Sequence, residues 1–259
     1  MMRTLLVRGM LAGLIAGVLA TLFAYFFGEP SINAAIGIEE AGGAAHSHTH
    51  DPGAGHTGAE PAAPAEPEEE LVSRDVQSTL GLLVAVGVYG TAIGGLFSLA
   101  FAFVYGRVGS LRPRLTAAAL GAFAFAVVFF VPFLKYPGNP PAVGKPETIG
   151  ERTGLYFGFV ALSLLFAVLA LVLSRKLTAR FGAWTAGLLG VAGYLVVMAL
   201  SAWLMPVIDE VGTGFPASTL WTFRVSSIGT QLVLWTALGL TFGALAERVF
   251  AKKAVAAAA

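Results

Sequence analysis

The residues best suited to chemistry are the four histidines, which all lie within eleven positions: His46, His48, His50 and His56. Alternate residues of an extended chain project to the same side. A flexible segment could therefore wrap two or three imidazoles and the Asp51 carboxylate around one divalent ion. Imidazole suits Co, Ni, Cu and Zn, and affinity alone would favour Cu over Co. The competing interpretation is a low-complexity solubilising segment whose histidines bind nothing.

This segment belongs to the longest polar stretch, which we expect to form an external loop over residues 28–78. Residues 42–70 are rich in Gly, Ala, Pro, Glu and His and contain no aromatic residue. Such a composition cannot bury enough apolar surface to offset the entropy of ordering. We therefore expect disorder at 42–70.

Polar residues also flank or enter the apolar stretches. Carboxylate, amide and carbonyl oxygens at the mouth of a helical bundle could pass a hard or borderline cation inward. The alternative is that they are ordinary boundary charges, helix stops or, within the last stretch, hydrogen bonds between helices. The candidates for translocation or gating are Glu29, Asn139, Glu147, Arg152, Asp209, Glu210, Arg224 and Gln231.

One arginine precedes each apolar stretch that starts on the same side as the long loop: Arg74, Arg152 and Arg224. A cation at a helix N-terminus opposes the helix dipole. We expect a nearby carboxylate, of Glu29, Asp209 or Glu210, to compensate, and we hypothesise that these ion pairs gate the bundle.

The elements that must position these groups are six stretches without a charged residue, each of at least 19 residues. At about 1.5 Å per residue, a helix of that length spans roughly 30 Å of hydrocarbon. The chain is 56% hydrophobic and 12% charged, and it lacks the alternating strands of an outer-membrane barrel. We predict one all-α polytopic membrane domain over residues 1–259. Its spans are Gly9–Phe27, Leu80–Tyr105, Leu115–Leu134, Gly154–Leu173, Ala183–Met205 and Ile228–Ala246.

Charge sorting predicts the orientation. Eleven of the sixteen lysines and arginines lie at one set of ends, together with both termini, whereas fourteen of the fifteen carboxylates lie at the other. Basic residues stay on the cytoplasmic side. We therefore expect both termini inside a bacterial plasma membrane. The short basic connections predict that the second and third spans form one hairpin and the fourth and fifth another.

The spans themselves contain no Asp, Glu, Lys, Arg or His, which argues against a proton relay through the midplane. Gly9, Gly13 and Gly17 repeat at every fourth residue, as do Gly239 and Gly243. This spacing is typical of faces where helices pack closely.

Several function classes are excluded or disfavoured. The chain has no cysteine, which excludes disulfides and thiolate sites, and too few basic residues for a nucleic-acid footprint. Residues 138–146 differ from a phosphate loop in glycine spacing and place Pro146 where Ser or Thr is required, so we expect no nucleotide. His-Glu-x-x-His is absent, and no histidine outside the loop could act as a general base. We therefore expect that this protein is not an enzyme.

Two loops carry a resemblance to a known family. Residues 136–153, YPGNPPAVGKPETIGERT, and residues 215–231, FPASTLWTFRVSSIGTQ, closely resemble loops of the CbtA family of predicted cobalt transporter subunits. The size and the His-rich loop are also similar, so the resemblance covers nearly the whole chain. Members of that family are often described with five spans, whereas six apolar stretches occur here.

The resemblance implies Co²⁺ uptake linked to cobalamin supply, with Ni²⁺ or Zn²⁺ left open. It also implies a small partner subunit with one span and its own histidines, and a homo-oligomer is left open. It supplies no established ligand residues. The alternative function is a membrane-anchored metal-binding accessory or sensor that does not conduct. Transport predicts a polar path lined by Gln231, Asn139 and Asp209, whereas a binding module predicts a packed bundle with metal at the histidines alone.

Overall fold

The computed structural model describes residues 2–47, 72–107 and 109–258, and within these ranges the chain is helical with no strand. Five continuous helices are each long and apolar enough to cross a membrane. The predicted class, a polytopic helical membrane protein, is therefore confirmed. The elements are α1 (Met2–Phe23), a π-helical turn (Ala24–Gly28), α2 (Glu29–Ser47), α3 (Arg74–Val76), a second π turn (Gln77–Gly81), α4 (Leu82–Val104), α5 (Pro113–Ala124), a third π turn (Phe125–Phe130), α6 (Val131–Lys135), a 3₁₀ turn (Pro146–Thr148), α7 (Ile149–Leu204) and α8 (Ala217–Ala258).

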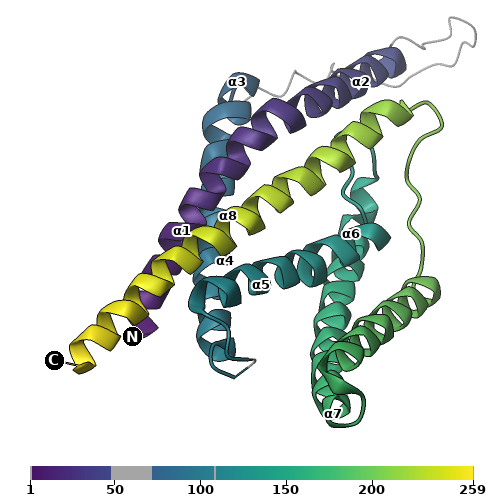
Figure 1. Ribbon diagram of the computed structural model, residues 1–259. Coiled ribbons are helices and arrows are strands. Elements are labelled where there is room, and N and C mark those ends of the chain that lie inside the picture. The colour runs from purple at the N-terminus through teal and green to yellow at the C-terminus, as the bar shows by residue number, and fades with distance from the viewer. Residues whose placement is uncertain (1, 48–71, 108, 259) are drawn as a thin grey trace, which may run out of the picture.

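The difference between five helices and six apolar stretches lies in α7, which folds back on itself (Figure 1). Gly182 breaks it with φ 78° and ψ 161°, a backbone conformation that is essentially restricted to glycine. The two legs, 149–181 and 183–204, pack against each other. Ser163 Oγ lies 2.7 Å from the Tyr194 hydroxyl, and a Cβ on Gly190 would overlap Ser174 Oγ. The predicted hairpin of the fourth and fifth spans is confirmed.

The helix of the first span does not end at Phe27, where the sequence analysis placed the end of the span and the start of a loop. The helix runs on through α2, past Pro30, because the π turn before it changes the hydrogen-bond pattern. The Glu29 N–H donates to the Ala24 carbonyl, five residues back. The third span contains a similar π turn before Pro132, where the Val131 N–H donates to the Ala126 carbonyl. Proline lacks a donor and normally interrupts a helix, and a wide turn accommodates it.

The glycine repeats form close contacts between helix backbones. A Cβ on Gly13 would lie 2.1 Å from the Gly90 carbonyl oxygen, and one on Gly9 would lie 2.4 Å from that of Gly94. The backbones of α1 and α4 therefore touch. Gly243 similarly faces Arg114 and Ala117 on α5. The predicted close-packing role of these glycines is confirmed.

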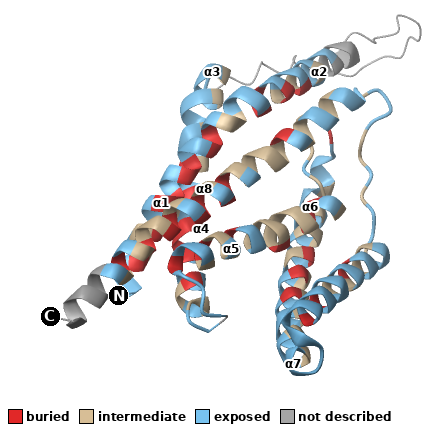
Figure 2. Cartoon of the chain, viewed as in Figure 1, coloured by how far each residue is buried: buried red, intermediate tan, exposed pale blue. Residues whose placement is uncertain are grey.

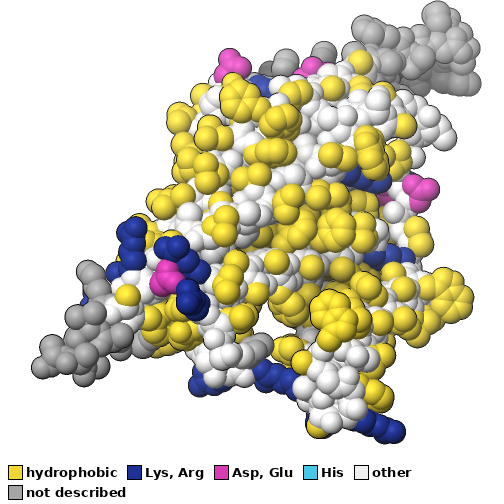
Figure 3. Space-filling model, viewed as in Figure 1, with side chains coloured by type: hydrophobic (Ala, Val, Ile, Leu, Met, Phe, Trp, Pro, Cys, Tyr) yellow, Lys and Arg dark blue, Asp and Glu magenta, His cyan; other side chains and the backbone are white. Residues whose placement is uncertain are grey.

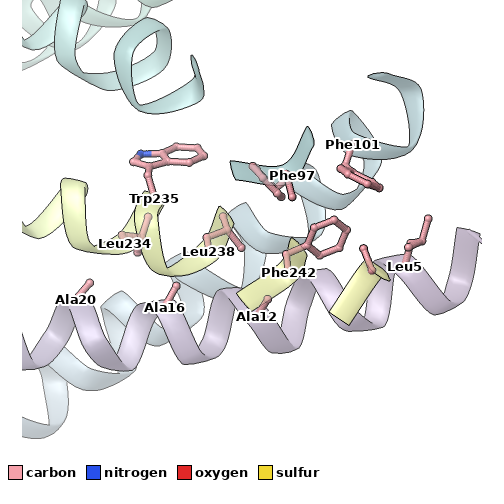
Figure 4. Close-up of a cluster of buried hydrophobic side chains, with 12 residues drawn as sticks. Leu5, Ala12, Ala16, Ala20, Phe97, Phe101, Leu234, Trp235, Leu238 and Phe242 are labelled. Atoms are coloured by element: carbon pink, nitrogen blue, oxygen red, sulfur yellow. The ribbon is translucent and has the colours of Figure 1, made fainter. Parts of the chain in front are cut away.

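The core lies where α8 packs against α1 and α4 (Figure 4). Small residues of α1 face large residues of α8, and Phe242 stacks edge-on against Phe97 and Phe101 of α4. The second and third spans do not form the expected hairpin along their length. Instead, α4 packs along α1 and α5 packs along α8, because the glycines pair α4 with α1 and α5 with α8.

Buried residues follow the contact of α1, α4 and α8, whereas the α7 hairpin is largely exposed (Figure 2). A broad hydrophobic surface covers the face seen in Figure 3, with most Lys and Arg toward the end where α1 begins and α7 turns. Both chain termini lie near each other at that end (Figure 1). We call the opposite end, with residues 28–39, 135–152 and 205–224, the distal end.

Candidate functional site

A cavity of about 630 Å³ opens at the distal end, between α6, the first leg of α7, residues 208–211 and α8. Ligand sites typically have volumes of this order. Five aromatic side chains line it: Phe129, Phe133, Tyr136, Tyr156 and Phe157. Its charged and amide side chains are Lys135, Asn139, Arg152, Asp209, Glu210 and Arg224. Segments from four separate parts of the sequence therefore meet at one polar-lined hollow.

The best-held carboxylate in this cavity is that of Glu210. Arg152 Nη1 lies 3.2 Å from Glu210 Oε2, and the Glu210 side chain is only 6% exposed. The same carboxylate accepts hydrogen bonds from the Thr148 hydroxyl and the Lys145 backbone N–H. Gly144, with φ +117°, leaves room for the guanidinium, since a Cβ there would lie 2.6 Å from Arg152 Nη1. These contacts join the start of α7 to the segment before α8.

Arg224, on the first turns of α8, has no such carboxylate partner. Its Nη2 donates to Asn139 Oδ1 at 3.1 Å, and its Nε is buried without a hydrogen-bond acceptor. In the described part of the chain, no carboxylate forms an ion pair with it. Asp209 lines the same cavity but is exposed and accepts only a long bond from the Val211 N–H.

Two residues at the end of α6 hold the segment that follows α7. Lys135 Nζ donates to the Met205 carbonyl at 3.0 Å, and the Tyr136 hydroxyl donates to the Pro206 carbonyl at 2.9 Å. The ammonium also lies 5.5 Å from the centre of the Tyr136 ring, within cation–π range. Burial raises the pKa of Tyr136 above its usual value, which favours the protonated, donating phenol.

The third of these arginines, Arg74, forms its ion pair outside the cavity. Arg74 contacts the Glu29 carboxylate, and its Nε and Nη2 donate to Asn33 Oδ1 at 3.1 and 3.0 Å. The Glu29 side chain is 9% exposed. Because Glu29 and Asn33 lie one turn apart on α2, this pair fixes the beginning of the second span against the extension of the first.

A second hollow of about 520 Å³ lies on the other side of Arg152. It is lined by Ile38 and Glu39 of α2, by residues 142–146, and by Ile149 and Arg152. Ile149 and Arg152 also line the first cavity. Arg152 therefore lines both hollows, whereas its partner Glu210 lines only the distal cavity.

Deeper along α8, the polar side chains near Gln231 do not act as one group. The hydroxyls of Ser226, Ser227 and Thr230 donate to carbonyls of their own helix rather than to another helix. Gln231 Oε1 and Trp235 Nε1 are buried without hydrogen-bond partners. Gln231 does not line the distal cavity, so the polar lining in this conformation stops short of it.

The structure thus brings together five of the predicted residues and separates the others. Asn139, Arg152, Asp209, Glu210 and Arg224 line one cavity. Glu29 belongs to the separate Arg74 pair, Glu147 is exposed outside the cavity, and Gln231 lies deeper on α8. The predicted metal ligands His48, His50, Asp51 and His56, and the side chain of His46, lie outside the described residues. Within the described part, no three His, Asp or Glu side chains gather closely enough to hold a metal ion.

Sequence reasoning missed Lys135, Thr148 and Tyr156. A lysine at the end of an apolar stretch ordinarily extends toward the membrane surface, so its type gave no sign of a bond to Met205. Thr148 lies in a family-like loop, but its role depends on Glu210, which is 62 residues away. Tyr156 lies within an apolar stretch, where an aromatic residue ordinarily packs against other helices, so its type did not indicate that it lines the cavity.

Comparison with known families identifies the family of this chain. Residues 2–247 match the family described as "Probable cobalt transporter subunit (CbtA)". Neither the curated proteins nor the solved structures that were compared contain a match. The family description names a transporter subunit rather than an enzyme. Because the match covers nearly the whole chain, and the structure has several helices that could span a membrane, this multi-pass membrane protein belongs to the CbtA family of probable cobalt transporter subunits.

Proposed function

We propose that this chain is the membrane-embedded subunit of a cobalt uptake system and that the ion enters through the distal cavity. The observation that carries the proposal is that Arg152 lines both hollows and forms an ion pair with Glu210 of the distal cavity. A charged pair in this position can block passage when closed and expose a carboxylate when open. Glu210 would then offer its oxygens to the ion.

In this proposal the distal end faces outward, and both termini lie in the cytoplasm. The support is the charge distribution, because basic residues concentrate at the end with the termini and carboxylates at the distal end. Fourteen carboxylates on the outer side would also raise the local concentration of divalent cations.

The capture device would be the segment from His46 to His56, with Asp51 as a further ligand. Its geometry lies outside the described residues, and the support is sequence and position. α2 extends from the first span toward this segment, and its Ile38 and Glu39 line the hollow next to Arg152. An ion released from the histidines would therefore meet this hollow before the distal cavity.

The small one-span partner with its own histidines remains part of the proposal. The family description, a transporter subunit, supports a multi-component system. The largely exposed α7 hairpin offers apolar surface to lipid, to a partner span or to a second copy.

A second function, a metal-binding accessory or sensor, is favoured by one observation. The cavity contains Asn139 and Asp209 but does not reach Gln231. In the described conformation the polar path that transport predicts is therefore incomplete. Under the transport proposal this is a closed conformation, and opening must extend the path.

The test is uptake of radioactive cobalt into cells that carry the chain with its presumed partner or alone. A variant with His46, His48, His50 and His56 changed to alanine is compared with a variant in which Thr49, Thr57 and Ser47 are changed to alanine as a control for the segment. Transport predicts accumulation by wild type and control, and accumulation by the histidine variant only at high external cobalt. Cobalt binding by wild type without accumulation, with the partner present, would instead establish the accessory function.

A further inference from the structure

We infer that the distal cavity binds a small organic carboxylate, either free or as the anionic complex that it forms with a divalent metal ion. The inference deepens the proposed function, because it names the form in which the metal would enter, and it depends on that function only for the metal. The binding of the carboxylate itself follows from the charges and shape of the cavity.

The cavity has more positive than negative side chains. Lys135, Arg152 and Arg224 line it together with Asp209 and Glu210. Glu210 is already engaged by Arg152, Thr148 and the Lys145 N–H. The hollow therefore has one more positive than negative side chain, which favours an anion, including an anionic cobalt complex, over a free hydrated Co²⁺ ion.

Arg224 is the group that most lacks a partner. A guanidinium has five N–H donors and matches a carboxylate in a two-pronged arrangement. Here one Nη donates to the neutral Asn139 amide, while the buried Nε has no acceptor. Arg224 is half-buried, and even a partly withdrawn charge without a counter-charge is disfavoured. A ligand carboxylate would supply both the negative charge and the missing acceptor.

The shape of the hollow fits such a ligand. Its volume of about 630 Å³ suits a small organic anion with coordinated water. The apolar side chains of Phe133, Tyr156 and Phe157 lower the local dielectric constant and so strengthen the attraction between the guanidinium and the anion. A tricarboxylate such as citrate carries three negative charges near neutral pH, so its 1:1 complex with Co²⁺ remains anionic and could use the same arginine.

The experiment is equilibrium dialysis of the purified full chain in detergent with radiolabelled citrate, with and without equimolar Co²⁺. We expect wild type to bind citrate, and Arg224→Gln to bind it about tenfold more weakly or worse, as expected for the loss of a hydrogen bond between charged groups. Arg112→Gln, which removes an exposed arginine at the opposite end, is the matched control and should bind like wild type.

A second variant keeps the test valid if Arg224→Gln fails to fold. Asn139→Asp is nearly isosteric and places a carboxylate beside Arg224, so it should abolish citrate binding while the protein remains folded. Binding only in the presence of Co²⁺ would assign the site to the metal complex, and equal binding would assign it to the free acid. Absence of citrate binding in both arms, or equal binding by wild type, Arg224→Gln and Asn139→Asp, would overturn the inference.

The outcome is separable from the proposed function. Cobalt accumulation by a chain that binds no citrate would refute the carboxylate site and leave transport standing. Citrate binding by a chain that never accumulates cobalt, with its partner present, would refute transport and leave the site standing.

Discussion

Arg152 and Glu210 lie 58 positions apart in the sequence, yet Nη1 of Arg152, whose side chain lines both hollows, is 3.2 Å from Glu210 Oε2. Arg152 lies in the first turn of α7, and Glu210 follows the end of its second leg. The pair therefore closes the distal end of the α7 hairpin. Its opening would change the hairpin and the cavity together.

Removing the charge of one partner in this pair should destabilise the protein. Arg152→Gln leaves Glu210 charged and largely buried, and we expect a loss of about 1–3 kcal/mol in the free energy of unfolding. Arg152→Gln combined with Glu210→Gln should recover part of that stability, since no charge is then unpaired. Thermal unfolding in detergent measures both. Stability of Arg152→Gln equal to that of wild type would show that the pair contributes nothing, and a double variant no more stable than the single one would contradict the cost of an unpaired Glu210.

The α1–α4 contact should not tolerate a side chain at Gly13. A Cβ there would lie 2.1 Å from the Gly90 carbonyl oxygen, so Gly13→Ala must separate the two helices. We expect a loss of about 1–3 kcal/mol, as for other overpacked contacts. Gly158→Ala is the control, because a Cβ at Gly158 meets nothing within 4 Å. Unfolding curves that rank the two variants alike would contradict the described packing.

The fold of α7 can be tested by cross-linking, because the chain has no cysteine of its own. Ser174→Cys and Gly190→Cys should form a disulfide on mild oxidation, since a Cβ on Gly190 would lie 3.2 Å from the Ser174 Cβ. In an unbroken helix these positions would be about 24 Å apart and could not be joined. Gel mobility before and after reduction reports the bond. A pair at Ser174→Cys and Gly187→Cys serves as the control and should cross-link less.

The contact between Tyr136 and the Pro206 carbonyl predicts a dependence on alkaline pH. Burial raises the pKa of the folded phenol above its usual value of 10.0. Its contribution is therefore complete below that value and is lost as pH rises through the folded pKa. Tyr136→Phe should lose about 0.5–1.5 kcal/mol at neutral pH. The difference from wild type should shrink above pH 10.0, as unfolding curves at pH 7 and in the alkaline range would reveal.

The sequence was most informative where one residue type has one dominant use in a membrane. Gly9, Gly13 and Gly17 predicted a close helix contact, and that contact is present. It was least informative about π turns, whose hydrogen bonds leave no clear residue pattern. For this reason Glu29 and Pro30 read as a helix end although the helix continues.

The candidate site was predictable in composition but not in pairing. The arginines and carboxylates could be named from their positions beside apolar stretches. Which carboxylate meets which arginine depends on the fold of α7, which brings Glu210 to Arg152 and leaves Arg224 with the Asn139 amide. Residues such as Lys135 and Thr148 act only through partners more than sixty positions away.

The central claim, that cobalt passes through the distal cavity, is tested most directly by blocking that cavity. Asp209→Cys places a single thiol in its lining, and a bulky methanethiosulfonate reagent is then added to vesicles that accumulate radioactive cobalt. Thr213→Cys, exposed on the same segment but outside the lining, is the matched control. We predict that the reagent stops uptake by Asp209→Cys and spares Thr213→Cys. Continued uptake by fully modified Asp209→Cys would contradict passage through this cavity.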